Sequence, residues 1–507
     1  MISMDSFFGH VARGLIVFQA FGVSIALPQS HRFQDVPLVS RDILVPEVER
    51  ELGQLLSNGS AIFGPDDPAW DDATERWNVE TEPDTKVVVQ PAQESDISTI
   101  SCQGGSLHGS KEVHTLEKPY QLFGRLATGS ADCVGFAGPA LGGGHGRYQG
   151  LYGLASDNFI NMNVVLADGS TIQVNQTSHD DLFWGMKGAG HNFGIVTGVE
   201  SRIYPREIDT WHYHNYIWTQ DKLEVLFETL NEFHKDGSTP AKMGVEFGAF
   251  AMNPSISETE AVLSWYFAYA GPAEEAEEIL KPFNEIEAAA EESGDVPYPD
   301  IPRIQEMDME SGTCSSNSYV GSSASLQRYN ITTERQIYQL FNETVALYPG
   351  IGAGSRVFHE GYSTEAVQAI DPDSSAYPHR DDLHLVFFTA AILEPQLREP
   401  AQQLADEIRD LWFASQPGRL PTVYSNYATG VESIESIYGY EPWRLERLLG
   451  LKAKYDPNNR FRYYVPLIPE NVQNLIFMAR ANPVNQQDRS GTADAGVPTV
   501  LSFASIG

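Results

Sequence analysis

The amino-acid sequence predicts an α+β fold with more than one domain. Its 507 residues exceed the usual size of a single domain, and 42% of them are hydrophobic, which is enough to form more than one core. After Pro205, strand patterns alternate with helix patterns, as expected for an antiparallel sheet covered by helices. Before Pro205, a glycine-rich stretch precedes several extended segments. We therefore expect a glycine-rich domain followed by an α+β domain.

The α+β domain is predicted from periodic segments between residues 206 and 419. Period-two runs rich in aromatic and β-branched residues mark the strands, and helical periodicity marks the helices. Residues 293–323 are rich in Pro, Gly and Ser, and we expect them to form a loop. The expected strands are 211–218, 245–252, 261–270, 352–359 and 384–392, and the expected helices are 221–234, 273–283 and 400–415.

The glycine-rich stretch holds nine glycines between residues 129 and 153. Glycine at this density lets backbone amides approach another group closely, and a phosphate or pyrophosphate is the usual group. The alternative is a set of tight turns in a β-rich domain. The segments that follow the stretch are needed to decide between the two.

Three extended segments follow the glycines. Residues 164–169 and 171–174 predict a hairpin with an Asp-Gly turn. Gly188, Gly190 and Gly194 then lead into the run IVTGVESRIYP. A doubly wound dinucleotide fold requires G-x-G-x-x-G between a strand and a helix. Here the last spacing is one residue too long and β-branched residues follow, so that fold is excluded.

Five ordered motifs in this region carry a specific resemblance. The strings VGFAGPALGGGHG, YGLASDN, VVLADG, DLFWGMKGAGHNFGIVT and RIYP resemble the second half of the FAD-binding domain of berberine-bridge-enzyme-like FAD-linked oxidoreductases, of the vanillyl-alcohol oxidase and p-cresol methylhydroxylase type. The resemblance implies a two-part FAD-binding domain and a substrate domain. It also implies that FAD is held by Val134, Gly135, Gly138, Gly142, Gly143, Gly144, Gly153, Leu154, Asp157, Asn158, Gly194, Val196 and Asn426.

A second group of motifs lies near the C-terminus. YSNY at 424–427, WRLERL at 443–448 and LKAKYDPNNRF at 451–461 resemble the C-terminal signature of the same family. In relatives, the first tyrosine faces the reactive side of the flavin and the asparagine helps to fix the cofactor. The resemblance therefore assigns these roles to Tyr424 and Asn426, and residues 420–469 are expected to return to the FAD-binding domain.

The N-terminal half departs from the family pattern. Residues 86–91 predict a strand and 94–97 the start of a helix, but 98–101 then lead directly into SCQGGSLHG. The Arg-Gly-Gly-Gly-His loop, whose histidine carries the flavin covalently in relatives, has no counterpart, and the neighbours of His108 match a later strand. Ala131 stands where some relatives have a second attachment cysteine. We expect a truncated domain and non-covalent FAD; the alternative is a flavin-poor, non-catalytic remnant or a binding protein of the same fold.

The first 26 residues are interpreted as a signal peptide. Arg13 precedes the apolar run 15–27, and Ser24 and Ala26 form a small-x-small cleavage pattern. The alternative is an ordinary buried N-terminal helix. Four glycosylation sequons fit secretion. The expected order is a signal peptide at 1–26, an FAD-binding domain at 27–205, a substrate domain at 206–419, the C-terminal return at 420–469 and a tail at 470–507.

Charge and composition exclude some partners. The net charge of −35 opposes binding to nucleic acid or to an anionic membrane surface, and no segment after the leader approaches the length of a membrane span. The three cysteines, Cys102, Cys133 and Cys314, allow at most one disulfide. His212 and His214 alternate along a strand; a half-exposed strand face is the preferred interpretation and a metal site the alternative.

These observations predict a secreted oxidoreductase that transfers a hydride from a small organic substrate, resembling a sugar or a secondary metabolite, to FAD. Molecular oxygen is the expected electron acceptor. Tyr424 is the candidate base, although a free tyrosine titrates near ~10 and would need donors that stabilise its phenolate. Relatives with a carboxylate partner carry it on the strand after YPHR (377–380). Here that strand has no acid before Glu394, so the substrate side is expected to be apolar.

Overall fold

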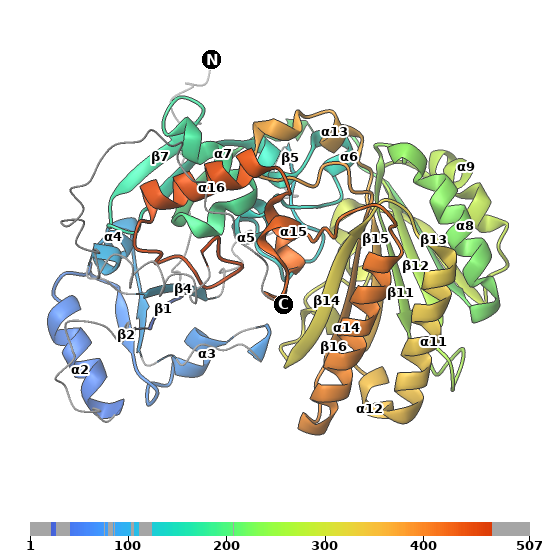
Figure 1. Ribbon diagram of the computed structural model, residues 1–507, viewed down its shortest axis with the longest axis horizontal. Helices are drawn as coiled ribbons and strands as arrows, with labels where there is room; N and C mark the ends of the chain where they lie inside the picture. The colour runs from blue at the N-terminus through green and yellow to red at the C-terminus, as the bar shows by residue number, and fades with distance from the viewer. Residues whose placement is uncertain are drawn as a thin grey trace, which may run out of the picture. The chain divides into compact units, whose positions relative to one another are not determined.

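The computed structural model describes residues 22–26, 41–75, 77–79, 85, 87–102, 106–110, 124–205 and 207–468. All of these residues except residue 468 belong to one compact unit. Four antiparallel sheets organise it, and Figure 1 shows the largest of them with its helices. Within the described ranges, no helix is both long enough and apolar enough to cross a lipid bilayer.

A four-stranded sheet forms the N-terminal part. Its strand order is β2-β3-β1-β4, and every neighbouring pair is antiparallel. Strand β1 falls within the predicted signal peptide, so cleavage after Ala26 would remove the strand that joins β3 to β4. The strands are β1 (Gly22–Ala26), β2 (Ala61–Phe63), β3 (Val87–Gln90) and β4 (Ser106–Ser110), and the helices are α2 (Arg41–Leu52), α3 (Trp70–Thr74) and α4 (Glu94–Cys102).

The glycine-rich part contains a three-stranded sheet in the order β7-β6-β8 and a two-stranded sheet of β5 and β9. The expected hairpin is confirmed, but its loop, 166–170, is longer than two residues. The glycines at 188–194 end a helix and lead into a strand. The elements are β5 (Gly124–Leu126), α5 (Ala137–Leu141), α6 (Gln149–Tyr152), β6 (Phe159–Val165), β7 (Thr171–Asn175), α7 (Asp180–Ala189), β8 (Ile195–Ser201) and β9 (Ile203–Pro205).

A seven-stranded antiparallel sheet dominates the second domain, in the order β13-β10-β12-β11-β15-β16-β14. The predicted α+β class is confirmed. The strands are β10 (Trp211–Trp218), β11 (Met243–Ala251), β12 (Val262–Tyr269), β13 (Ala290–Val296), β14 (Tyr319–Leu326), β15 (Ser355–Gly361) and β16 (His384–Ala391). The helices are α8 (Leu223–Phe233), α9 (Ala273–Asn284), α10 (Ile301–Ile304), α11 (Ile331–Leu347), α12 (Pro349–Gly352), α13 (Glu365–Gln368) and α14 (Arg398–Ala414).

One expectation for this domain is wrong. Residues 293–323, predicted to be a loop, contain the end of β13, the short helix α10 and the start of β14. Strand β13 reads AEESGDV, an acidic edge strand whose face is solvated, so it lacks the apolar alternation that sequence patterns detect. Helix α11 was not predicted at all.

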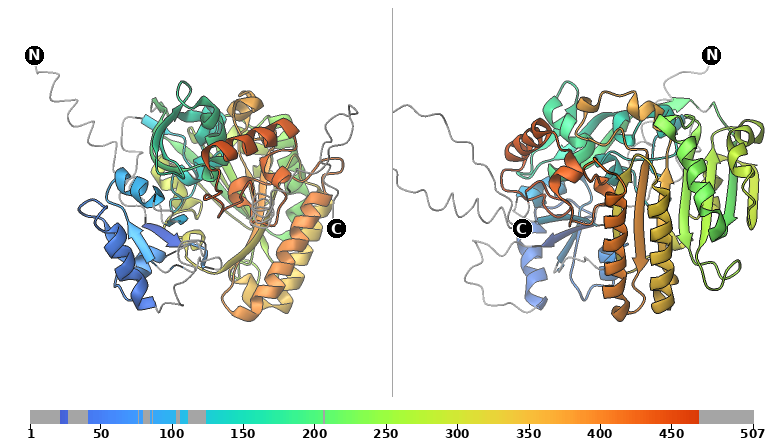
Figure 2. Two further views of the ribbon diagram at one scale, coloured as in Figure 1. Left: turned by 60° about the vertical axis from the view of Figure 1, so that its left-hand side comes forward. Right: turned by 45° about the vertical axis from the view of Figure 1, so that its right-hand side comes forward.

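The two faces of the large sheet have different partners. Helices α8, α9, α11 and α14 cover one face, and α11 and α14 run side by side along it (Figure 2). Side chains alternate along β15, so Val357 packs under these helices while Phe358 and Tyr362 belong to a separate cluster with Leu154 and Tyr424. The second face of the sheet therefore packs against the glycine-rich part.

The C-terminal segment rejoins the glycine-rich part. Helices α15 (Ile434–Tyr438) and α16 (Pro442–Tyr455) contribute to the core that contains α7. Lys452 of α16 is fully buried, and its ammonium donates to the carboxylate of Asp456 and to two backbone carbonyls. A buried ammonium needs such partners, and they fix the YDPNNRF turn against the core.

Candidate active site

The site is built where the glycine-rich loop meets the YSNY segment. Tyr424 follows the sheet domain in sequence, and its side chain is 4% exposed. Its hydroxyl oxygen accepts hydrogen bonds from the backbone N–H of Gly144 at 3.1 Å, from that of His145 at 3.4 Å and from the side-chain amide of Asn426 at 2.6 Å. Three donors therefore converge on one oxygen.

Glycine is required at this turn because of backbone conformation and close packing. Gly143 and Gly144 have φ values of +117° and +87°, which side chains other than glycine rarely adopt. A Cβ on Gly142 would lie 2.2 Å from Oδ1 of Asn426, and one on Gly143 would lie 2.7 Å from the ring of Tyr377. The turn thus aims its amides at Tyr424 and keeps the loop against the YSNY segment.

Burial controls the ionisation of Tyr424. It raises the pKa of the phenol to about 12, although the three donors lower it and the nearby Glu360 carboxylate raises it further. The donors that a phenolate would need are present, as the sequence analysis required. Because burial outweighs them, the hydroxyl remains protonated near neutral pH.

Glu360 is a buried acid beside this cluster, and the sequence patterns did not single it out. It lies on β15 between Phe358 and Tyr362, on the face that meets the glycine-rich part, and is 4% exposed. The hydroxyl of Tyr427 donates to its two carboxylate oxygens at 3.1 and 3.0 Å. Burial raises the pKa of this carboxyl to about 8, against the lowering effects of Tyr427, Tyr362 and Arg147.

The expectation of an apolar substrate side did not take this buried acid into account. Glu360 pairs in register with Leu385 of β16, so an acid occupies the strand next to the one that was searched. The predicted strand ended at His359, one residue too early. A single acid between aromatic residues in the sequence FHEGY is the signal that could have found it, because an unpaired buried carboxylate is costly and rare.

His145 joins the same cluster. Its Nδ1 lies 2.8 Å from the amide oxygen of Gln149, and its Nε2 lies 2.7 Å from the hydroxyl of Tyr377. Since an amide oxygen only accepts, Nδ1 carries the proton and Nε2 accepts from the tyrosine. Burial lowers the pKa of His145 to about 4, so the imidazole is neutral.

Gly153, Leu154, Asp157 and Asn158 form a neighbouring turn, and Leu154 packs in the hydrophobic cluster that contains Tyr424. Asp157 makes a buried ion pair with Arg380 at 2.7 Å and accepts from the N–H of Leu154 at 2.9 Å. The amide of Asn158 donates to the carbonyl of Leu154 at 2.9 Å. Their polar groups are bonded to the protein and hold this turn in place beside Tyr377.

The other predicted cofactor residues lie apart from Tyr424. Val134, which is 47% exposed, and Gly135 precede α5, and Gly138 lies within that helix. Gly194 precedes β8, and a Cβ there would lie 2.5 Å from Val164. Val196 pairs with Val164 inside the three-stranded sheet. The structure thus brings together Tyr424, Asn426 and Gly142–Gly144 from the predicted set, and adds His145, Glu360, Tyr377 and Tyr427.

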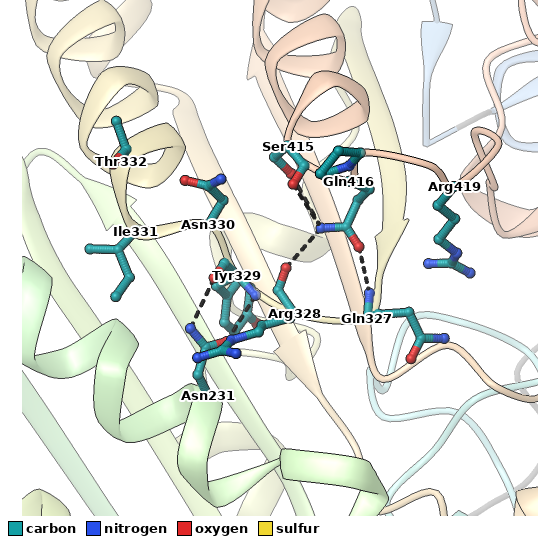
Figure 3. Close-up of a pocket in the computed structure, with 11 residues that line it drawn as sticks. Asn231, Gln327, Arg328, Tyr329, Asn330, Ile331, Thr332, Ser415, Gln416 and Arg419 are labelled. Atoms are coloured by element: carbon teal, nitrogen blue, oxygen red, sulfur yellow. Dashed lines mark hydrogen bonds between the residues drawn. The ribbon is translucent and has the colours of Figure 1, made fainter.

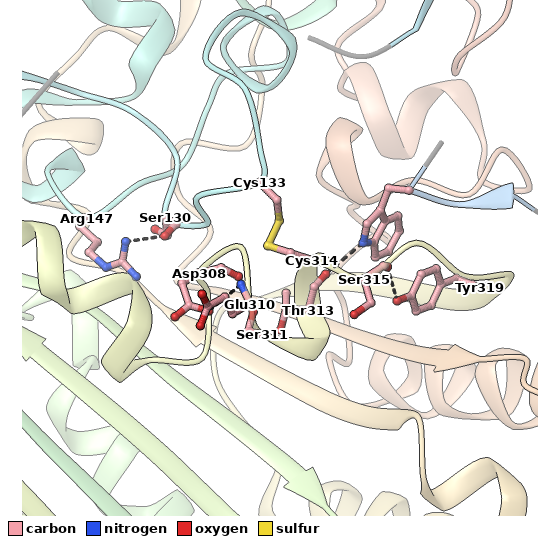
Figure 4. The surroundings of a disulfide bond; sticks show 11 residues. Ser130, Cys133, Arg147, Asp308, Glu310, Ser311, Thr313, Cys314, Ser315 and Tyr319 are labelled. Carbon is pink, nitrogen blue, oxygen red and sulfur yellow. Dashed lines mark hydrogen bonds between the residues drawn. A yellow bond between two sulfur atoms is a disulfide. The ribbon is translucent and has the colours of Figure 1, made fainter. Parts of the chain in front are cut away.

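A disulfide joins the glycine-rich segment to the second domain. Cys133 is bonded to Cys314, with a Cα–Cα distance of 5.7 Å and 181 positions between them in sequence (Figure 4). The sequence allowed one disulfide but left its partners open. The bond anchors the segment before α5 to the connection between β13 and β14.

A pocket of about 540 Å³ lies elsewhere, by the ends of α11 and α14 (Figure 3). It is open, and its polar side chains serve the backbone: Gln416 bonds to Gln327 and Arg328, and Asn231 bonds to Tyr329. It does not include Tyr424 or Glu360. We therefore place the chemistry at the buried cluster and not in this pocket.

Comparison with known proteins decides the family. A family profile described as "FAD binding domain" matches residues 108–175. The FAD-linked oxidoreductase iacH of Pestalotiopsis fici is 48% identical over 498 residues, which cover 87% of this chain and 95% of the relative. The chain belongs to the family of FAD-linked oxidoreductases. A second family member, OXR2 of Pyricularia oryzae, is 46% identical over 490 residues, covering 86% of this chain and 94% of that protein.

Solved structures show the same fold. BBE-like 1 of Physcomitrella patens superposes with a TM-score of 0.68 at 18% identity, covering 83% of this chain and 99% of that chain. A chitooligosaccharide oxidase superposes with a TM-score of 0.67 at 20% identity and the same coverage. The recognition made from the sequence motifs, the FAD cofactor and the assignment as an FAD-linked oxidoreductase are confirmed.

The residues around Tyr424 fit a flavin ring. The backbone N–H groups of Gly144 and His145 and the amide of Asn426 donate to the hydroxyl of Tyr424 and fix this phenol, while the glycine turn could approach a flavin ring closely. The glycines at 142–144 and Asn426 would hold the ring. Glu360 on β15 and Tyr427 in the YSNY segment would face it from the substrate side.

Proposed function

We propose that this FAD-linked oxidoreductase oxidises a C–H group of a small organic substrate, with molecular oxygen as the electron acceptor. FAD supplies the hydride acceptor when bound. The fold neighbours include oxidases named for chitooligosaccharide and glucooligosaccharide, which supports a sugar-like substrate. A secondary metabolite remains the other substrate class under the proposal. Where the oxidised carbon carries a hydroxyl group, that group loses its proton during oxidation.

The buried Glu360–Tyr427 pair carries the proposal. An acid–base group works best when its pKa lies near the working pH. Burial places the pKa of Glu360 at about 8 and that of Tyr424 at about 12. We therefore give the base role, first assigned to Tyr424, to Glu360. Tyr427 orients the carboxylate, and Tyr424 positions the donors of the glycine-rich turn.

Removal of the substrate proton follows from these contacts. Glu360 in its ionised form accepts the hydroxyl proton of the substrate as the C–H bond breaks, and the Tyr427 hydroxyl bonds to the carboxyl group in either state. Arg147, which is 2% exposed, favours the ionised carboxylate. The closely packed aromatic rings of Tyr424 and Tyr427, 5.1 Å apart, exclude water from the carboxyl group.

We further propose that the chain lacks part of the first half of the FAD-binding domain and holds FAD without a covalent bond. The match to the FAD-binding profile begins at residue 108, just after the junction at 98–101. The alignment with iacH is 498 positions long. It covers 87% of the 507 residues of this chain, which is several tens of residues fewer than the length of the alignment. Many aligned positions thus have no residue here. Secretion through the predicted leader is part of the same proposal.

The test is anaerobic reduction of the FAD-loaded protein. Oligosaccharides, simple alcohols and amines are added in turn, and bleaching of the flavin absorbance is followed. The matched variant is Glu360→Gln, which keeps the size and hydrogen bond of the side chain. We expect one substrate class to bleach wild type rapidly and the variant slowly. A protein that takes up no FAD would instead support the second candidate, a non-catalytic remnant, which the missing segment favours.

A further inference from the structure

Two histidines and a glutamate meet near the edge of the large sheet, on its helix-covered face. His212 and His214 of β10 share this face, and Glu277 reaches them from α9. Oε1 of Glu277 lies 2.7 Å from Nε2 of His212 and 2.9 Å from Nδ1 of His214. The sequence analysis preferred a half-exposed strand face. That interpretation is wrong, because His212 is 3% and His214 is 8% exposed.

A second layer of polar groups fixes these three side chains. Oδ1 of Asp295, on the edge strand β13, lies 2.7 Å from Nδ1 of His212. The amide of Asn284 donates to Oε2 of Glu277 at 2.7 Å. A carboxylate on the far nitrogen of a histidine is the usual support of a metal-binding imidazole, since it sets the tautomer and orientation of the ring.

The nitrogens of His212 and His214 make more close contacts with carboxylate oxygens than two neutral imidazoles have N–H groups to donate. His212 directs both ring nitrogens at carboxylate oxygens, and Glu277 receives a nitrogen from each histidine. A neutral imidazole has one N–H group, so it can donate to one of its two carboxylates only. If the single proton of a neutral ring sits on Nδ1, toward Asp295, the lone pair of Nε2 faces an oxygen of Glu277, and a proton or a metal ion can occupy the position between them. A cation placed between these two atoms removes the repulsion.

We propose that His212, His214 and Glu277 bind a divalent transition-metal ion, for which zinc is the best match. Imidazole nitrogens and a carboxylate oxygen are zinc ligands, and the three atoms lie within 4.8 Å of one another. Bonds of about 2.0–2.1 Å in a tetrahedron place ligand atoms roughly 3.4 Å apart. The two short contacts would therefore open by roughly half an ångström, which is within the range of small side-chain rotations. The ion ties α9 to β10 and, through Asp295, to the edge strand β13.

A comparable cluster in the core lacks these features. His234, Glu246 and His384 also lie within 4.8 Å of one another, but all are deeply buried. There the second nitrogen of His234 bonds to the hydroxyl of Thr239, and the second oxygen of Glu246 accepts from Trp265. One neutral imidazole satisfies those contacts without a cation. No metal is proposed for that cluster.

The test uses the purified, FAD-loaded full chain, stripped with a chelator and then titrated with zinc chloride. Bound zinc is measured by elemental mass spectrometry after desalting, and the melting temperature is recorded with and without zinc. The variants are Glu277→Gln at a ligand and Asp295→Asn at the supporting carboxylate. His179→Gln, a histidine in the other domain, is the matched control. Flavin absorbance reports whether each variant is folded.

We expect one zinc ion per wild-type chain and a higher melting temperature with zinc. Asp295→Asn should weaken zinc binding by about 10–100-fold, as for other supporting residues, and Glu277→Gln should weaken it more. His179→Gln should bind zinc as wild type does. The proposal is overturned if stripped wild type takes up no zinc, or if folded Glu277→Gln and Asp295→Asn bind it as tightly as wild type. The wild-type measurement stands even if a variant fails to fold.

Discussion

Replacing Glu360 by glutamine should change the pH dependence of stability in a way that can be calculated. Burial raises the pKa of this carboxyl from 4.5 to about 8. Between these pH values the folded protein keeps a proton that the unfolded chain has lost. Stability therefore falls as pH rises through this window and levels off above about pH 8. At about 1.36 kcal/mol per pKa unit, the full loss is about 5 kcal/mol.

Glu360→Gln removes this loss because glutamine resembles the protonated acid. The variant should match wild type near pH 4.5 and become more stable than wild type above pH 8. At roughly 1 °C per kcal/mol for a chain of this length, the melting temperatures at pH 9 should differ by about 5 °C. The assay is thermal unfolding of both proteins at pH 5 and pH 9. Exposed Glu365→Gln is the control. Equal pH dependence in Glu360→Gln and wild type would refute the assignment of a buried, protonated carboxyl.

Three further predictions follow from the site and the fold. Glu360→Gln should slow flavin reduction by about 10²–10⁴-fold, which is the range for loss of a general base. Tyr424→Phe should slow it less and leave FAD bound. If stopped-flow measurements gave the reverse order, the base role would return to Tyr424. Cys314→Ser should lower stability by about 2–5 kcal/mol and abolish the effect of reducing agents on the melting temperature, and unchanged sensitivity would exclude the Cys133 bond. If the protein is secreted, glycopeptide mapping should find sugar on the exposed Asn330 and none on Asn342. The amide of Asn342 is engaged, because it donates to the carbonyl of Tyr338 at 2.8 Å. A glycan on Asn342 would contradict this prediction.

The sequence predicted those elements whose own residues form a clear strand or helix pattern, and those site residues that belong to a family motif. Strand β10 matches its predicted bounds because it is rich in aromatic residues, and α8 was found from its apolar period. Motif order identified the family from the glycine-rich and YSNY segments. The motifs also singled out Tyr424, Asn426 and the glycines at 142–144, and these residues lie together in the structure.

The missed features depend on tertiary contacts. Glu360 is buried because it pairs with neighbours on β11 and β16, and the acid in FHEGY gives only a weak local sign of that burial. His212 and His214 become candidate metal ligands only because Glu277 lies beside them, and Glu277 is 63 or more positions away in sequence. The acidic strand β13 is held by pairing with β10, so its own residues do not predict a strand.

The central claim is that this chain is a working FAD-linked oxidoreductase that holds FAD without a covalent bond. The most direct measurement is the visible absorbance of the purified protein, before and after acid precipitation. We predict a yellow protein whose flavin moves into the supernatant on precipitation. Colour that stays with the pellet would contradict non-covalent binding. A colourless protein that also fails to take up added FAD would contradict the proposal of a working flavoenzyme.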